Sequence, residues 1–76
     1  MIYNLAVLPS FPDEPTDEYL IGQMRNFRNM LLQGSDWTQV ADAPVNKQAW
    51  AEYRQALRDF PSTWVPSETV EFPDTP

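Results

Sequence analysis

The stretch SDWTQVADAPVNKQAWAEYRQALRDFP, residues 35–61, contains two of the three tryptophans and the strongest helical pattern of the chain. Its apolar side chains recur at intervals of three, four and three, which places them on one face of an α-helix: Trp50, Tyr53, Leu57 and Phe60. Asn46 has a side-chain oxygen that can cap the first turn, and Pro61 cannot continue the hydrogen-bond ladder. The pattern therefore predicts a helix over residues 47–60 with one buried face.

A second helical pattern lies earlier in the chain, over residues 17–33. Thr16 is the expected N-cap, and the acidic residues that follow it lie where the helix dipole favours negative charge. Gly34 is expected to adopt the left-handed conformation that ends many helices. Apolar side chains again recur every three or four positions: Leu20, Met24, Phe27 and Leu31.

The connection between the two predicted helices, residues 34–45, is twelve residues long, which is unusual for a helix pair. We expect an antiparallel helical hairpin in which Trp37, held in a single turn of this connection, closes the open side. Five side chains are thereby assigned structural roles: Trp37, Trp50, Tyr53, Leu57 and Phe60.

Both ends of the chain are expected to be extended. Residues 1–15 begin with an aliphatic run that favours a short strand up to Pro9, and this strand must pair with residues 70–72, with a second copy or with a partner chain. Residues 62–76 predict an extended, proline-rich tail that either lies over the hairpin or binds a partner. The expected fold is mainly α, divided into residues 1–15, a hairpin domain of residues 16–61, and the tail.

The composition excludes several classes of function. The 76 residues include no cysteine and no histidine, so disulfides, zinc sites of the usual kind and the commonest catalytic bases and nucleophiles are absent. Eleven acidic and five basic residues give a net charge of −6, which repels nucleic acid. No apolar run reaches the roughly 18 residues that a membrane-spanning helix needs. We therefore expect a binding protein and not an enzyme, with no cofactor, no metal, and no membrane or nucleic-acid partner.

The basic residues of the predicted helices have no acidic residue three or four positions away, so local ion pairs are missing. Arg54 and Arg58 have two interpretations. In the first, they reach back to Asp36 or Asp42 and cover Trp37 with their aliphatic stems. In the second, they clamp an acidic segment of a partner.

Two aromatic residues of the tail, Trp64 and Phe72, lie in segments without periodicity and close to prolines. Side chains in such segments often dock into the groove of a partner, and packing on the chain itself is equally compatible with the pattern. The partner-binding hypothesis therefore covers four residues: Arg54, Arg58, Trp64 and Phe72.

Several short motifs follow one another in an order and spacing found in a known family. They are R..RN.LL over residues 25–32, SDWTQ over 35–39, D.P over 42–44, WAEYRQALRDFP over 50–61 and VEFPDTP over 70–76. Through these motifs, residues 23–76 resemble the phage tail assembly chaperone family.

The resemblance implies a non-enzymatic chaperone that binds and shields a phage tail or tail-fibre protein in the host cytoplasm during virion assembly. An alternative is a structural virion component, an adaptor or fibre-associated protein that stays in the tail of the mature particle. An acidic inhibitor that mimics nucleic acid is less favoured, because the carboxylates are interleaved with arginines. A homo-oligomer formed by strand pairing is a further alternative for the N-terminal residues, which lie outside the resemblance.

Overall fold

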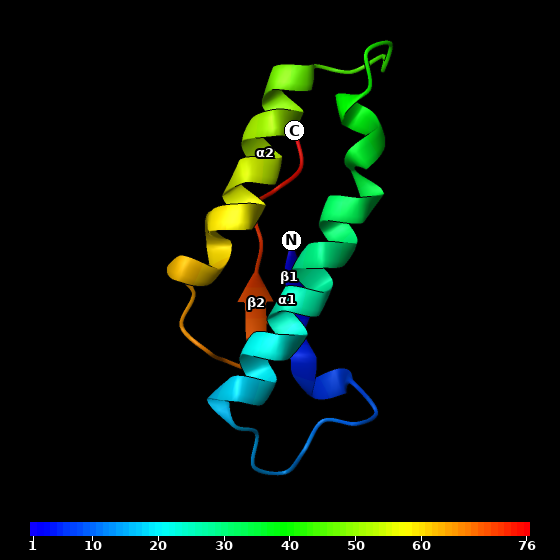
Figure 1. The fold of residues 1–76 in the computed structure, drawn as a ribbon. Coiled ribbons are helices and arrows are strands. Elements are labelled where there is room, and N and C mark those ends of the chain that lie inside the picture. The colour runs from blue at the N-terminus through cyan, green and yellow to red at the C-terminus, as the bar shows by residue number, and fades with distance from the viewer.

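Two helices dominate the computed structural model, which describes all 76 residues (Figure 1). In chain order, its elements are β1 (Ile2–Asn4), the 3-10 helix η1 (Leu5–Val7), α1 (Asp17–Gly34), the 3-10 helix η2 (Asp36–Gln39), α2 (Lys47–Asp59), the 3-10 helix η3 (Phe60–Ser62) and β2 (Thr69–Glu71). The helices α1 and α2 run in opposite directions, and both ends of the chain return to the region between them (Figure 1). The protein is therefore mainly α, with a small two-stranded antiparallel sheet.

The two predicted N-caps are confirmed. The Thr16 side-chain oxygen accepts from the backbone N–H of Tyr19 at 3.1 Å, and the Asn46 side-chain oxygen accepts from that of Ala49 at 3.1 Å. Each bond satisfies an N–H that has no partner inside its helix. At the other end, α2 stops at Asp59, because the chain tightens into η3 around Pro61.

The end of α1 differs from the expectation. No residue of the chain has a positive φ, so Gly34 does not form the predicted left-handed cap. The chain instead continues through Ser35 into η2, and the Ser35 hydroxyl donates to the carbonyl oxygens of Leu31 at 2.8 Å and Leu32 at 3.2 Å. These bonds satisfy the last carbonyls of α1 without a reversal of the chain.

The chain ends pair with one another, which is the first of the three alternatives for the N-terminal strand. β1 and β2 are antiparallel with Tyr3 opposite Val70, and the N–H of Leu5 extends the pairing to the carbonyl of Glu68 at 2.7 Å. The strand is shorter than predicted. It ends at Asn4, whose side-chain oxygen accepts from the N–H of Ala6 at 3.0 Å and starts the turn of η1.

The core combines side chains from both helices and both chain ends. Three of its seven buried apolar residues, Leu5, Val70 and Phe72, come from the ends. Phe72 is only 2% exposed, so it does not stand free in a tail as the partner-binding hypothesis required. The other four core residues are two from each helix: Leu20, Met24, Tyr53 and Leu57.

The molecule is thin, with extents of 46 × 24 × 16 Å and a radius of gyration of 14.0 Å, compared with about 11 Å for a compact chain of this length. Only 10 of the 76 residues are buried, so each core side chain contributes a large share of the stability.

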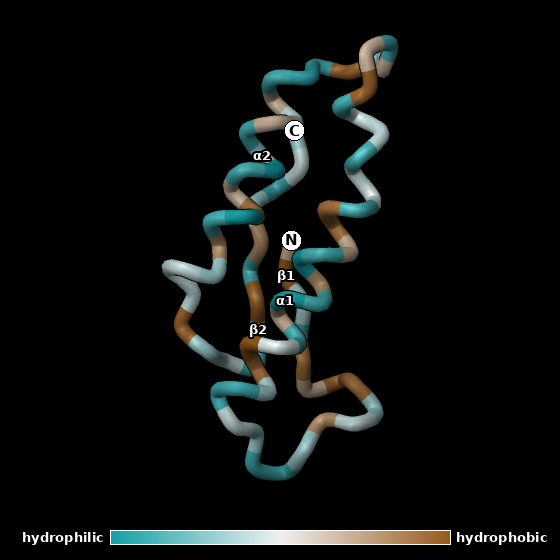
Figure 2. Tube along the Cα trace, in the orientation of Figure 1, coloured by the Kyte–Doolittle hydropathy of each residue, from teal (hydrophilic) through white to brown (hydrophobic).

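Apolar residues follow the strand pair between the helices and appear again in the connection from α1 to α2 (Figure 2). Neither helix has the length and apolar character needed to span a bilayer.

Replacement of Phe72 with alanine tests whether this ring is part of the core. We expect Phe72→Ala to lower the free energy of unfolding by about 3–5 kcal/mol, because it empties a buried site. Val65→Ala is the matched control, since Val65 is 78% exposed, and it should change stability by no more than about 0.5 kcal/mol. Equal urea midpoints for the two variants would contradict the core position of Phe72.

Candidate binding site

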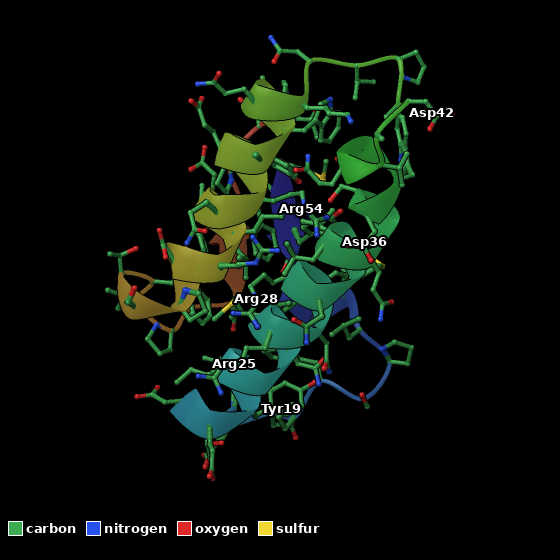
Figure 3. The ribbon with its side chains drawn as sticks, turned by 45° about the horizontal axis from the view of Figure 1, so that its top comes forward. Tyr19, Arg25, Arg28, Asp36, Asp42 and Arg54 are labelled. Atoms are coloured by element: carbon green, nitrogen blue, oxygen red, sulfur yellow. The ribbon has the colours of Figure 1, made fainter.

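The best-buried charged side chain of the protein is Arg54 of α2, which is 8% exposed. Its guanidinium donates from Nη1 to the Leu32 carbonyl at 2.6 Å and to Ser35 Oγ at 2.7 Å, and from Nη2 to Asp36 Oδ1 at 2.6 Å. Figure 3 shows Arg54 beside Asp36, while Asp42 lies further along the connection. The guanidinium therefore joins α2 to the end of α1 and to the start of η2.

These bonds place a positive charge at the C-terminal end of α1, where the helix dipole is negative and the carbonyls lack helical partners. The planar guanidinium fork reaches all three acceptors at once, which a point charge such as lysine cannot do. Arg54 is thus an intramolecular brace with Asp36, and it is not exposed for a partner to bind.

Substitution of Arg54 tests the brace. We expect Arg54→Met to lower the free energy of unfolding by about 1.5–3 kcal/mol, because it removes three charge-assisted hydrogen bonds, and Arg54→Lys to recover only a minor part. The control is Arg58→Met, at an exposed position of the same helix, which should stay within about 0.5 kcal/mol of the native protein. Indistinguishable thermal midpoints for the Met variants at positions 54 and 58 would rule the brace out.

The prediction that Trp37 closes the hairpin is wrong. Trp37 is 51% exposed, and its ring only touches the edge of the core through Trp50, at a centroid distance of 6.3 Å. The tight turn of η2 directs Thr38 inward instead. Thr38 is fully buried, and its hydroxyl donates to the Ser35 carbonyl at 2.6 Å.

The exposed indole belongs to an apolar area at the connected end of the two helices, which we name the hairpin-end patch: Met30, Trp37, Val40 and Trp50. The first three are each 51% exposed. Trp50 is half-buried and lies between two of them, because it contacts the Trp37 ring and lines a hollow of about 200 Å³ together with Met30. An apolar surface of this kind on an acidic protein is typical of a protein-binding site.

The remaining aromatic residues of α2 and the tail pack on their own chain. Trp50 meets Tyr53 edge to face at 5.6 Å, and Tyr53 is buried. Trp64 stacks on Phe60 at a centroid distance of 6.4 Å, and Phe60 lies 4.9 Å from Phe72. Trp64 is therefore half-buried against the core, which favours the self-packing interpretation for this residue.

Tyr53 gives the protein an expected sensitivity to alkaline pH. Burial raises the pKa of the Tyr53 hydroxyl above its ordinary value, and the neighbouring Tyr3 phenolate raises it further. The unfolded chain releases this proton near pH 10 while the folded chain still holds it, so the free energy of unfolding falls as the pH rises above about 10.

Thermal melts between pH 9 and 11 test this sign. We expect the melting temperature of Tyr53→Phe to fall less over this range than that of the native protein, because the variant keeps the ring and loses the ionisable group. Parallel pH profiles for the two proteins would contradict the assignment.

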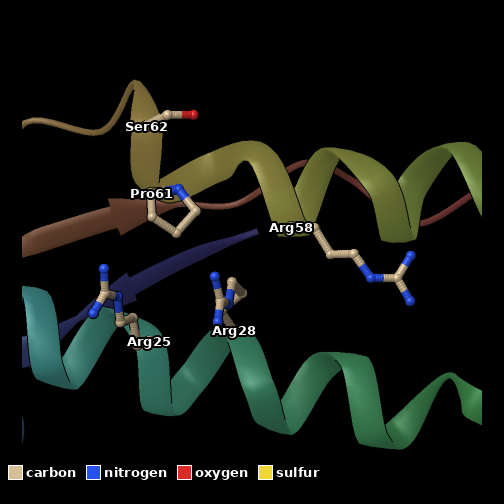
Figure 4. A pocket seen from close by; sticks show the side chains of 5 residues that line it. All are labelled: Arg25, Arg28, Arg58, Pro61 and Ser62. Carbon is tan, nitrogen blue, oxygen red and sulfur yellow. The ribbon is translucent and has the colours of Figure 1, made fainter.

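A second concave region, which we name the arginine hollow, has a volume of about 500 Å³ and is lined by Arg25, Arg28, Arg58, Pro61 and Ser62. Arg25 and Arg28 extend from α1 toward Pro61, whereas the Arg58 side chain leaves α2 and extends along the helices away from them (Figure 4). Arg58 was a predicted partner-binding residue, but Arg25 and Arg28 were not. The sequence feature that could have identified Arg25 and Arg28 is their lack of acidic neighbours along the helix. That they line one hollow with Arg58 depends on how the helices pack.

These features together describe a small acidic helical domain with two surface sites, one apolar and one basic, and no cluster of side chains suited to a metal ion. The profile of one family, described as phage tail assembly chaperone protein, matches residues 21–76. The chain therefore belongs to the phage tail assembly chaperone family. No curated protein and no solved structure matches it.

The match confirms the resemblance found in the sequence and extends it by two residues toward the N-terminus. It covers α1 from Ile21 onward together with η2, α2, η3 and β2, and thus all residues of both surface sites. The family name indicates a chaperone role in phage tail assembly, which implies a tail protein as the partner.

Proposed function

We propose that this protein is a non-enzymatic assembly chaperone that binds a phage tail or tail-fibre protein and shields its apolar surface in the host cytoplasm until assembly. Membership of the chaperone family over residues 21–76 carries this proposal. The hairpin-end patch is the proposed contact surface, since it is the apolar area that the fold leaves exposed at one end of the molecule.

The side chains of the patch suit a client-binding surface. Tryptophan brings a large rigid contact area, and the flexible thioether of Met30 adapts to surfaces of different shape. Covering the exposed half of the Trp37 ring buries about 100 Å² of apolar surface, which contributes about 2.5 kcal/mol. Since association also costs rotational and translational freedom, a patch this small favours reversible binding, as release of the client requires.

The brace prepares the patch for binding. Asp36 and Ser35, which precede Trp37, are both held by the Arg54 guanidinium. The backbone of η2 is therefore fixed before the client arrives, and less conformational entropy is lost when Trp37 is covered. The net charge of −6 keeps the protein and its complexes soluble.

Co-expression with a tail or tail-fibre protein of the same phage tests the proposal. We expect the native protein to raise the soluble fraction of the client, and Trp37→Ser to weaken binding by roughly 50-fold because it removes the apolar contact of the indole. Val65→Ser is the matched control, because Val65 is 78% exposed and lies outside the patch.

Two outcomes would overturn the proposal. In the first, the client is equally soluble with and without this protein. In the second, mass spectrometry finds the protein in purified virions in stoichiometric amounts, which would make it a structural component of the tail. An unchanged melting temperature of the Trp37→Ser variant separates lost binding from lost folding.

A further inference from the structure

The arginine hollow holds three of the four arginines of a chain that has eleven acidic residues. None of the three forms an ion pair, because the two ion pairs of the structure join Arg54 to Asp36 and the Met1 amino group to Asp74. The only side-chain acceptor among their hydrogen bonds is the neutral Asn29 amide oxygen, which accepts from Arg28 at 2.9 and 3.3 Å. The hollow is thus lined by three positive charges that have no ion-pair partner in the chain.

The acidic residues close to the hollow in the sequence have other partners. Asp59, which follows Arg58, accepts from Gln55 Nε2 at 3.0 Å on the solvent side of α2. Arg25 and Arg28 extend side by side into the hollow (Figure 4), where like charges repel one another, and an anion bound there reduces that repulsion.

We propose that the arginine hollow binds an acidic peptide segment of a partner protein, one that carries at least two carboxylates. This proposal rests on the proposed function only in taking the tail protein as the partner. Most of the residues that line the hollow are arginines, so its contribution is to recognise charge. The hairpin-end patch, in contrast, recognises apolar surface.

The geometry favours a peptide over a single small anion. Arg25 and Arg28 lie three residues apart on α1, about 4.5 Å along the helix axis, and Arg58 extends from α2 away from them (Figure 4). A single small anion cannot contact arginines that point apart, whereas an extended chain places carboxylates on alternate residues about 6.6 Å apart and can present several of them along the hollow. Each guanidinium binds a carboxylate through two parallel hydrogen bonds. A volume of about 500 Å³ also exceeds what one phosphate fills.

The charge of the whole protein disfavours nucleic acid as the occupant. Apart from the three arginines, the chain has eleven acidic residues and two basic ones, Lys47 and Arg54, which leaves a charge of −9 around the hollow. A long phosphate backbone extends past the hollow and meets this charge. A short acidic segment lies within about one Debye length, 8 Å, of the arginines and is attracted to them locally.

Fluorescence anisotropy of the full chain with a labelled peptide tests the proposal. The probe is an unstructured octapeptide of alternating glutamate and glycine, and the control is the same peptide with glutamine in place of glutamate. We expect the glutamate peptide to bind at low salt. Each single change, Arg25→Gln, Arg28→Gln or Arg58→Gln, should lower the affinity about two- to fivefold, and the triple variant should lower it at least about tenfold.

A matched variant controls for net charge. Lys47→Glu combined with Gln48→Glu also brings the chain to −9, at the first turn of α2 and about 16 Å along the helix from Arg58. This variant should keep the affinity of the native protein within about twofold. All the changed side chains are at least partly exposed, so circular dichroism melts should show that each variant folds.

Four results of the peptide assay would overturn the proposal: no binding of the glutamate peptide, equal binding of the glutamine peptide, unchanged binding by the triple variant, or an equal loss of affinity in the variant with Lys47→Glu and Gln48→Glu.

Two competition results would assign the hollow to another ligand. Inorganic phosphate that competes at the concentration of the peptide would make this a small-anion site, and tighter binding of an oligonucleotide would make it a nucleic-acid site. Both also contradict a peptide site. Because the assay contains no client, its failure leaves the chaperone proposal standing, and failure of co-expression leaves the peptide result standing.

Discussion

The pairing of the two chain ends is the constraint on which this structure depends. Two helices of this length, in a molecule 16 Å thick, bury too few side chains to hold together alone, and the strand pair brings Leu5, Val70 and Phe72 between them. A chain of 76 residues buries only about 60% of the surface that it exposes when unfolded, so three added core residues decide whether it folds. The ends are distant in sequence, and their pairing therefore couples the whole chain into one cooperative unit.

The Arg54 brace has a different role, because it determines how the two helices are connected. The guanidinium donates to the Leu32 carbonyl near the end of α1 and holds Ser35 and Asp36, so it takes the place of the expected glycine cap. The connection then leaves α1 through η2, and Trp37 points outward while Thr38 points inward. A buried polar interaction thus produces the exposed apolar patch, which links the stability of the fold to its proposed binding surface.

The features that the sequence predicts correctly are local ones. Apolar residues at intervals of three and four identify α1 and α2, and Thr16 and Asn46 mark their starts, because helix periodicity and capping depend on neighbours a few positions away. The resemblance to the chaperone family was also readable, since it lies in ordered motifs.

The misplaced residues depend on tertiary structure. Phe72 lies in a proline-rich segment, and pairing of the N-terminal strand with residues 70–72 was one of three alternatives that the sequence left open. Only the tertiary structure shows that this pairing forms and that the ring is buried. Trp37 resembles a core residue because of its size, yet the turn of η2 buries Thr38 and leaves Trp37 51% exposed. Arg25, Arg28 and Arg58 likewise line one hollow only when α1 and α2 lie side by side.

Native-state hydrogen exchange tests the central claim, that the chain ends belong to the core, most directly. The amides of Leu5 and Phe72 donate to Glu68 and Met1 across the paired ends, at 2.7 and 2.8 Å. We predict that both amides exchange only through global unfolding, with the same free energy of opening as the amide of Leu57 in α2. If both exchange at the rate of an unstructured chain while Leu57 stays protected, the ends are not part of the core and the account is wrong.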